Sequence, residues 1–324
     1  MQVHTFLTGP FPRSESLVAA TRDLDRGRTS AATVRELFRS SEEEVRALER
    51  RLGLDPPSGG YLAWADLFRP FAETYRGFTV GPVTRWFETN TFYRQPILHA
   101  PPERVDGAIA SWWPIGPRSG TPAPKACLPG PYTFIGLLDN RSGETREALT
   151  HRMGRLLAEE VRELRAAGFG AFQFQEPLLV VNPPHGPLSE AVVAAYRALA
   201  DAAAGAPTIV WTYFADASPS LELLGRLPVT VVGVDLAETE PASLDEALAG
   251  KALGLGCIDP RTTLPEDPAE VARIVRALEE RLAPPSVWLG AGGPLDLLPA
   301  SEAARKLELL PSARALLAGD GGRP

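Results

Sequence analysis

The sequence predicts an α/β protein, a closed (β/α)8 TIM barrel with a helical insertion between its first and second strands. Short apolar runs alternate with amphipathic helical patterns, which is typical of parallel strands joined by crossover helices. We count eight such runs, the strand number of this barrel. The chain of 324 residues exceeds the roughly 250 of a bare barrel and leaves room for an insertion. Counting alone also allows an open doubly wound sheet.

Each predicted strand is an apolar run that ends in a turn-forming or polar residue. In chain order the eight runs are His4–Thr8, Thr84–Glu88, Lys125–Pro129, Ala171–Gln175, Ile209–Phe214, Val229–Asp235, Ala252–Ile258 and Val287–Gly290. Apolar residues recur at helical spacing between several of them. These patterns predict helices over Glu147–Ala167, Leu188–Ala203 and Pro268–Leu282, the last with Asp267 as its N-cap.

The first connection, from Arg13 to Thr84, is far longer than a barrel requires. It holds three helical patterns, over Ser16–Arg26, Ser30–Leu52 and Leu62–Tyr75. We therefore expect an accessory helical layer at residues 14–80 that belongs to the same domain as the barrel. The prediction is one domain over residues 1–324.

Composition excludes several classes of protein. The formal net charge is -7 and arginines are scattered, so we expect no nucleic-acid partner. No apolar run approaches the roughly 18 residues needed to span a bilayer, and the first residues lack the pattern of a secretory signal. Two cysteines are too few for a disulfide framework. The expected compartment is the cytoplasm.

Polar residues at the carboxyl ends of the strands are the candidate catalytic groups, because active sites of such barrels lie there. Glu176 is the main candidate acid or base, since partial burial would raise the pKa of its carboxyl. An equally weighted alternative is that Glu176 orients backbone or pairs with Arg13 or Arg261. Asp235 and Asp259 also end apolar strands and are the other catalytic candidates.

Further polar and aromatic residues at these ends are candidates for binding a substrate or cofactor. Asn90 and Thr212 can hydrogen-bond an amide-bearing heterocycle, and aromatic rings can stack on it. An aromatic residue near a strand is more often part of the core, but Trp112 and Trp113 lie in the Pro- and Gly-rich segment Pro101–Pro124. The predicted binding residues are Arg13, Trp86, Asn90, Thr133, Gln175, Thr212, Tyr213, Arg261 and Trp112.

The order of the short motifs is similar to that of a known family. The segments TGPFPR, RWFETNTFY, LPGPYTF, FQEPLL, TYF, LPVTVVGVDL and LGCIDPR, closed by a Gly-rich strand, extend from Thr8 to about Lys306. Together they resemble cobalamin-independent methionine synthase, most of all its N-terminal barrel. The resemblance implies a methyltransferase that uses a methyl-tetrahydrofolate-type co-substrate.

The chain departs from this family at the positions of the zinc ligands. The resemblance implies zinc ligands in an H-x-C pair after strand five, a Glu after strand six and a Cys in a turn after strand eight. Here the first and last of these positions read Trp211–Tyr213 and Gly290–Gly293. Cys127 and Cys257 belong to different predicted strands and are interpreted as small buried hydrophobic residues. We therefore expect no zinc.

Three hypotheses follow for the function. The first is methyl transfer to a small nucleophile without the chain's own zinc, with a general base such as Glu176 or Asp235. The second is a non-catalytic folate-binding partner of a zinc-bearing methionine synthase subunit. The third is a metal-free lyase or decarboxylase resembling uroporphyrinogen decarboxylase, in which Arg13, Arg261 and Asp259 would handle a carboxylated substrate. The fold alone does not decide among them.

Overall fold

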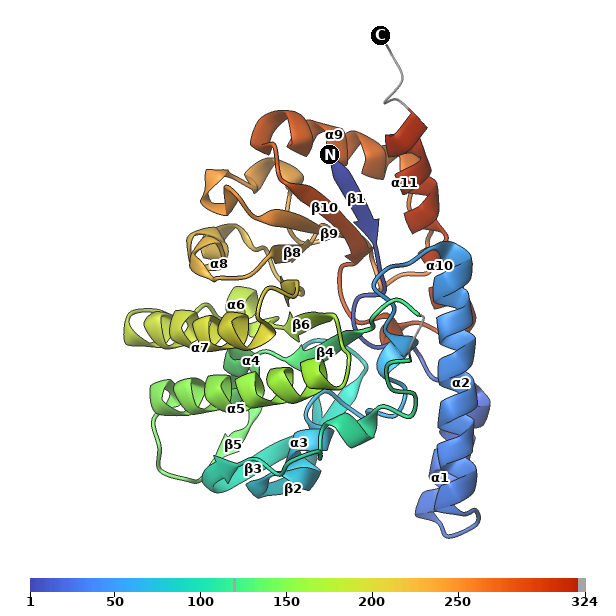
Figure 1. Ribbon diagram of the computed structural model, residues 1–324, viewed down its shortest axis with the longest axis vertical. Helices are drawn as coiled ribbons and strands as arrows, with labels where there is room; N and C mark the ends of the chain where they lie inside the picture. The colour runs from blue at the N-terminus through green and yellow to red at the C-terminus, as the bar shows by residue number, and fades with distance from the viewer. Residues whose placement is uncertain (119–120, 320–324) are drawn as a thin grey trace.

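A parallel β-sheet forms the centre of the molecule in the computed structural model, which describes residues 1–118 and 121–319 (Figure 1). Its seven strands lie in the order β1-β10-β9-β8-β7-β6-β4. Their bounds are β1 Gln2–Thr5, β4 Lys125–Pro129, β6 Ala171–Gln175, β7 Thr208–Trp211, β8 Val231–Asp235, β9 Ala252–Ile258 and β10 Ser286–Ala291. All seven overlap predicted strands, and β4, β6 and β9 have the predicted bounds.

Helices cover the outside of this curled sheet (Figure 1). Those after β4 are α4 Pro131–Leu137, α5 Arg146–Ala166, α6 Leu178–Val181, α7 Pro187–Ala203, α8 Leu221–Arg226, α9 Pro268–Leu282, α10 Ala300–Leu307 and α11 Leu309–Gly319. Asp267 caps α9 as predicted, because its carboxylate accepts from Ala269 N at 2.9 Å. α5 packs closely on α7, where a Cβ on Gly154 would lie 2.5 Å from Ala195 Cβ.

The predicted closed barrel of eight strands is not confirmed. In the described part of the chain β1 and β4 are the edge strands of the seven-stranded sheet. The predicted second strand, Thr84–Glu88, is wrong: Thr84 and Arg85 end β2 (Arg76–Arg85), which pairs antiparallel with β3 (Phe92–Glu103). The physical reason is proximity in sequence, since a turn of six residues, 86–91, places a partner strand directly after β2. The short β5 (Asp139–Asn140) completes this separate sheet.

The helical insertion is confirmed in its first two helices, α1 (Glu15–Asp25) and α2 (Ala31–Leu52). The third predicted helix is wrong over most of its length, because the chain there forms the 3-10 turn η1 Gly59–Tyr61 and the short helix α3 Arg69–Thr74. The carboxylate of Asp66 accepts from Phe68 N and Arg69 N, and the helix begins only there, at Arg69. The helical layer therefore ends before the predicted residue 80, because residues 76–80 belong to β2.

The inside of the sheet combines a large aromatic ring with a few polar residues. The Trp211 indole lies directly over Gly233 and Gly254, where any Cβ would clash with the ring. Beside it, Lys125 Nζ donates to Gln173 Oε1 at 2.6 Å. Complete burial lowers the pKa of Lys125 to about 8.

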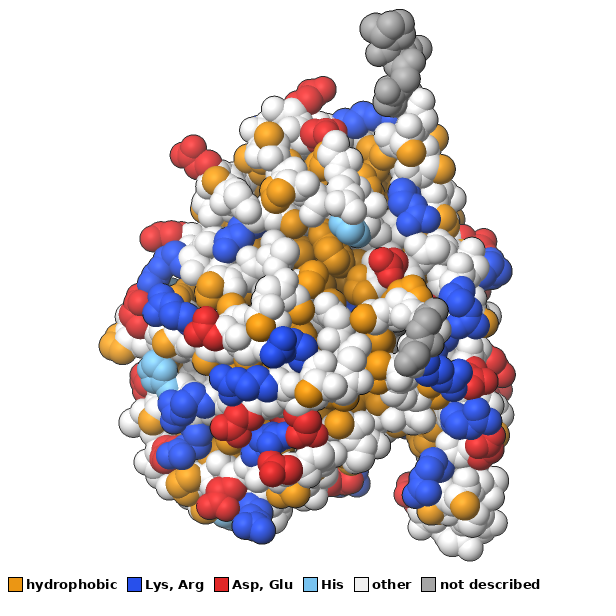
Figure 2. Space-filling model, viewed as in Figure 1, with side chains coloured by type: hydrophobic (Ala, Val, Ile, Leu, Met, Phe, Trp, Pro, Cys, Tyr) orange, Lys and Arg blue, Asp and Glu red, His pale blue; other side chains and the backbone are white. Residues whose placement is uncertain are grey.

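The outer surface in Figure 2 carries interspersed Lys, Arg, Asp and Glu side chains on the side of α5 and α7. A strip of hydrophobic side chains lies between the sheet and α2 in the same view. No helix within residues 1–118 and 121–319 is long and apolar enough to cross a membrane.

Candidate functional site

A pocket of about 650 Å³, part of it open to solvent, lies where the β-sheet meets the helical insertion and the β2–β3 hairpin. Its sheet-side lining comes largely from residues at or beyond carboxyl ends of strands, the edge where such folds bind ligands. The lining residues are Pro10, Tyr61, Trp64, Ala65, Asp66, Leu67, Trp86, Thr91, Phe92, Tyr93, Cys127, Gln175, Tyr213, Pro294 and Asp296. Six of these fifteen residues are aromatic, so the pocket is mainly apolar, with aromatic walls and a few polar groups.

Three of the predicted binding residues line this pocket, namely Trp86, Gln175 and Tyr213. Gln175 is the last residue of β6, and Tyr213 follows β7 by two residues. Gln175 Nε2 donates to Cys127 Sγ at 3.3 Å. Cys127 is buried as predicted, but it lines the pocket as well.

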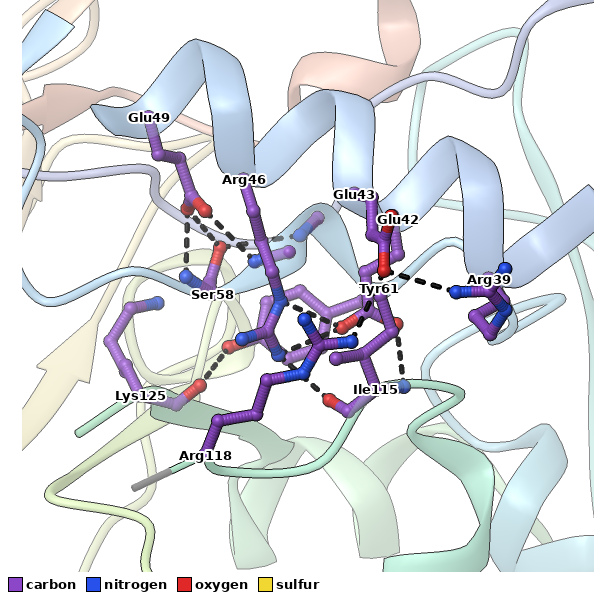
Figure 3. A network of polar contacts seen from close by, with 12 residues as sticks. Arg39, Glu42, Glu43, Arg46, Glu49, Ser58, Tyr61, Ile115, Arg118 and Lys125 are labelled. Atoms are coloured by element: carbon purple, nitrogen blue, oxygen red, sulfur yellow. Dashed lines mark hydrogen bonds and ion pairs between the residues drawn. The ribbon is translucent and has the colours of Figure 1, made fainter. Parts of the chain in front are cut away.

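The wall contributed by the helical insertion is held by a polar network on α2 (Figure 3). The buried carboxylate of Glu49 accepts from Ser58 N at 2.7 Å, Ser58 Oγ at 2.8 Å and Gly59 N at 3.1 Å. These bonds fix a turn in which Gly59, Gly60 and Tyr61 all have positive φ, a conformation that a tyrosine rarely adopts. Tyr61 OH then donates to Lys125 O at 2.8 Å, which ties the wall to β4.

A second part of this network fastens α2 to the chain before β4 (Figure 3). Glu42 pairs with Arg46 at 2.9 Å and accepts from Ile115 N at 3.2 Å, while Arg46 donates to Ile115 O. Burial raises the pKa of Glu42 to about 7. Together with Glu49, this pair holds the insertion rigidly against the sheet.

Sequence reasoning missed both carboxylates that line the pocket, Asp66 and Asp296. Asp296 lies in the turn η6 (Leu295–Leu297), five residues beyond β10, and its side chain is exposed to the pocket space. Surrounding protein nevertheless desolvates it and raises the pKa of its carboxyl to about 6, against the opposing charge of Arg13. The Gly-rich end of β10 was the one available signal, and it pointed to the correct loop but not to this residue.

Glu176 is fully buried and does not line the pocket. Its carboxylate accepts from Thr133 Oγ1 at 2.6 Å, Thr133 N at 2.8 Å, Tyr132 N at 3.1 Å and Tyr196 OH at 3.3 Å. Burial is the largest effect on its pKa, which rises to about 7. The contacts match the backbone-orienting alternative, because two donors are the first free N–H groups of α4. A catalytic role stays a prediction.

The other predicted acids gather around Arg261 in a separate cluster at the ends of β8 and β9. Arg261 pairs with Asp259 at 2.7 Å, with Asp235 at 3.4 Å and with Glu238. Burial raises the pKa of Asp235 to about 6, and Arg261 opposes this rise. Because the arginine already has three acidic partners, it offers little positive charge to a carboxylated substrate.

The remaining predicted residues have structural contacts outside the pocket lining. Arg13 donates to Leu62 O at 2.7 Å and lies over the Phe38 ring. Thr133 bonds Glu176, Thr212 Oγ1 donates to Gly233 O, and Asn90 is exposed in the hairpin turn. Trp112 packs on the core, and Trp113 is buried between Trp64 and Phe169. Stacking of either ring on a ligand stays a prediction.

The donors available in this part of the chain do not fit a zinc site. Zinc needs about four Cys, His or carboxylate ligands that converge. Over residues 1–118 and 121–319 there is no group of three or more His, Cys, Asp or Glu side chains placed to hold a metal ion. Cys127 has Gln175 as its neighbour, whereas Cys257 donates to Gly290 O at 3.6 Å. No step of the chemistry below is therefore assigned to a metal.

A curled parallel sheet with helices on its outside places the chain in the class of α/β-barrel-like folds. A cobalamin-independent methionine synthase from Shewanella, solved in complex with selenomethionine, has the same fold, with a TM-score of 0.76 over 98% of each chain and 18% identity. A methyltransferase from Methanosarcina mazei has a TM-score of 0.57 at 11% identity, covering 97% of this chain and 93% of that one.

The family model of the cobalamin-independent synthase N-terminal domain matches residues 71–283. The chain belongs to this family. It is 33% identical over 259 residues, 74% of its length, to a 5-methyltetrahydropteroyltriglutamate–homocysteine methyltransferase of Burkholderia pseudomallei. It is 30% identical over 229 residues, 64% of its length, to the enzyme of the same name from Nitratidesulfovibrio vulgaris. These matches cover only 31% and 29% of the two relatives.

Proposed function

We propose that the chain acts in methyl transfer and binds a methyl-tetrahydrofolate-type donor in the aromatic pocket. The observation that carries the proposal is the pocket itself, whose walls include Trp64, Trp86, Tyr93 and Tyr213. Such rings stack on a flat heterocycle, and an apolar lining with a few polar groups is typical of a small-molecule site. The names of the relatives supply the donor class, a methyltetrahydropteroyl compound.

The chain's own part in the reaction is to bind and orient this donor. Tyr61 and Trp64 are held in position by Glu49, so the stacking wall exists before the ligand arrives and less ordering entropy is lost on binding. The acceptor is a small nucleophile that approaches the methyl group from the open side of the pocket. Since the residues do not fit zinc, activation of a thiol acceptor is left to a separate zinc-bearing methionine synthase subunit.

The second candidate, a binding partner without turnover of its own, is supported by the donors of residues 1–118 and 121–319, which do not fit a zinc site. The chain spans about a third of the length of the relatives it matches. The decarboxylase-like alternative is not favoured, because Arg261 is already paired with acids and Arg13 lies outside the pocket lining.

The test has two stages. Tryptophan fluorescence would first follow a titration with 5-methyltetrahydropteroyltriglutamate, and saturable quenching is expected. Formation of methionine from homocysteine would then be measured with the chain alone and with a zinc-bearing C-terminal-type subunit added. Product without the subunit identifies a self-sufficient enzyme, and product only with it identifies the partner role. Absence of saturable donor binding would refute the proposal.

A further inference from the structure

The pocket contains a carboxylate whose hydrogen-bonding capacity is not used by the protein. Two aspartates line it, Asp66 and Asp296. Asp66 is occupied, because Oδ1 accepts from Phe68 N and Arg69 N and Oδ2 accepts from Arg94 N. Among the described residues, the only hydrogen-bond donor to the Asp296 carboxylate is its own backbone N–H, and Arg13 acts on it only through its charge.

Two further polar atoms belong to residues of the same lining and lack a partner in the described structure. They are Trp64 Nε1 and Gln175 Oε1, on side chains that are 8% and 2% exposed. A buried polar group without a partner costs about 1–3 kcal/mol, so such groups are rare unless something else satisfies them. Unpaired hydrogen-bond donors and acceptors beside aromatic rings are typical of a site that binds a polar heterocycle.

Desolvation raises the pKa of the Asp296 carboxyl group to about 6, which still leaves the group mostly ionised at pH 7.5. Arg13, in the segment after β1, lowers its pKa, and Tyr213, after β7, stays neutral because burial raises the pKa of its hydroxyl. Arg13 is in turn flanked by Asp66 and Arg69. Arg13 donates to Leu62 O and makes no ion pair within 4.0 Å of Asp296, so the carboxylate oxygens remain available to a ligand.

We propose that Asp296 recognises the amidine edge of a 2-amino-4-oxo heterocycle, the exocyclic amino group and the adjacent ring N–H, while the aromatic walls stack on its faces. A carboxylate presents two oxygens side by side and accepts two parallel N–H bonds from such an edge. This inference rests on the proposed function and names the group within the donor that the pocket reads. It makes Asp296 a specificity-determining residue, not a group that reacts.

The experiment compares two probes that differ at this edge alone. Pterin carries the 2-amino group, whereas lumazine has a carbonyl there, which would place an acceptor against the carboxylate. Binding of each at pH 7.5 would be measured by fluorescence titration for the unchanged protein, for Asp296→Asn and for the control Asp201→Asn. Asp201 lies on the exposed face of α7, so the control makes the same chemical change away from the pocket.

The expected result is that the unchanged protein and Asp201→Asn prefer pterin over lumazine by about ten- to a hundredfold, the range of charge-assisted hydrogen bonds. In Asp296→Asn the preference should fall to within about threefold, with an unaltered melting temperature. Pterin affinity of the unchanged protein should also fall between pH 7 and pH 5, as Asp296 takes up a proton, and that of Asp296→Asn should not.

Two outcomes overturn the inference, and they are distinguishable from failure of the proposed function. If the methyl donor binds but Asp296→Asn keeps the full preference for pterin, the assignment of Asp296 is wrong while the function stands. If donor and pterin bind but the unchanged protein does not discriminate pterin from lumazine, no residue reads the amidine edge. If the donor itself does not bind, the proposed function fails first.

Discussion

Replacing Glu176 by glutamine tests how this buried carboxyl group acts. Glutamine has the same shape but does not ionise, so the variant removes the titration of one group. Burial raises the pKa of Glu176 from its ordinary 4.5 to about 7 in the folded chain. A group whose folded pKa is raised binds its proton more tightly in the native state, so an acid of this kind contributes stability below pH 4.5 that is lost as the pH rises through 7.

The size of this effect follows from the two pKa values. At about 1.4 kcal/mol for each pH unit, the interval from 4.5 to about 7 corresponds to about 3 kcal/mol. The stability of the unchanged protein minus that of Glu176→Gln should therefore fall by about 3 kcal/mol between pH 4.5 and pH 8. Because Glu176 has no solvent exposure, screening by water does not reduce this value appreciably.

Urea unfolding of both proteins at several pH values measures the difference directly. The control is Glu159→Gln on the exposed face of α5, which should show no pH-dependent difference of this size. A difference that stays constant or grows with pH would refute the reasoning. It would mean that the donors from Tyr132, Thr133 and Tyr196 outweigh desolvation and keep Glu176 ionised even at pH 5.

Two further predictions concern the metal and the pocket wall. Elemental analysis of the desalted protein should find no stoichiometric zinc, and about one zinc per chain would contradict the ligand argument. Glu49→Ala should lower the free energy of unfolding by about 2–5 kcal/mol in urea titrations, because Ser58 N and Gly59 N lose their buried acceptor. The same variant should weaken donor binding, since it frees the turn that positions Tyr61, and undiminished affinity would show that the wall does not depend on Glu49.

Most of the parallel sheet could be predicted because its signals are local. Strands buried on both faces are nearly continuous apolar runs, and β4, β6 and β9 were delimited correctly for this reason. The helices α5, α7 and α9 have apolar residues at helical spacing and ends that are capped or marked by proline.

The β2–β3 hairpin could not be predicted from the sequence, because the apolar pattern of a segment does not say which other strand it pairs with. Thr84–Glu88 satisfies the same local criteria as a barrel strand. The exposed Val80 and Val83 show that β2 leaves apolar side chains in solvent, which a central strand would bury. Only the tertiary structure reveals that the two segments pair with each other and that neither joins the main sheet.

A position at the carboxyl end of a strand does not by itself predict that a residue lines the pocket. Gln175 and Glu176 are neighbours at the end of β6, yet the first lines the pocket and the second is buried beneath the start of α4. Gly130 explains the difference, because any Cβ there would overlap the Glu176 carboxyl group. The Gly130-Pro131 turn was visible in the sequence as a tight turn. Its function is to open a space that the carboxylate of the neighbouring strand fills, which removes that carboxylate from the pocket.

Asp296 is the opposite case, because it lines the pocket although it is not at the end of a strand. It lies five residues beyond β10, between leucines of which Leu295 is fully buried. A sequence reading assigns such a segment to packing. The buried Leu295 packs η6 against the core, and the side chain of the next residue, Asp296, lines the pocket. Leu295 therefore has two effects. Its apolar character makes the segment read as core in the sequence, and its burial fixes the position of Asp296 in the pocket. In the proposed role, an acid fixed in this way would bind a ligand without rearranging.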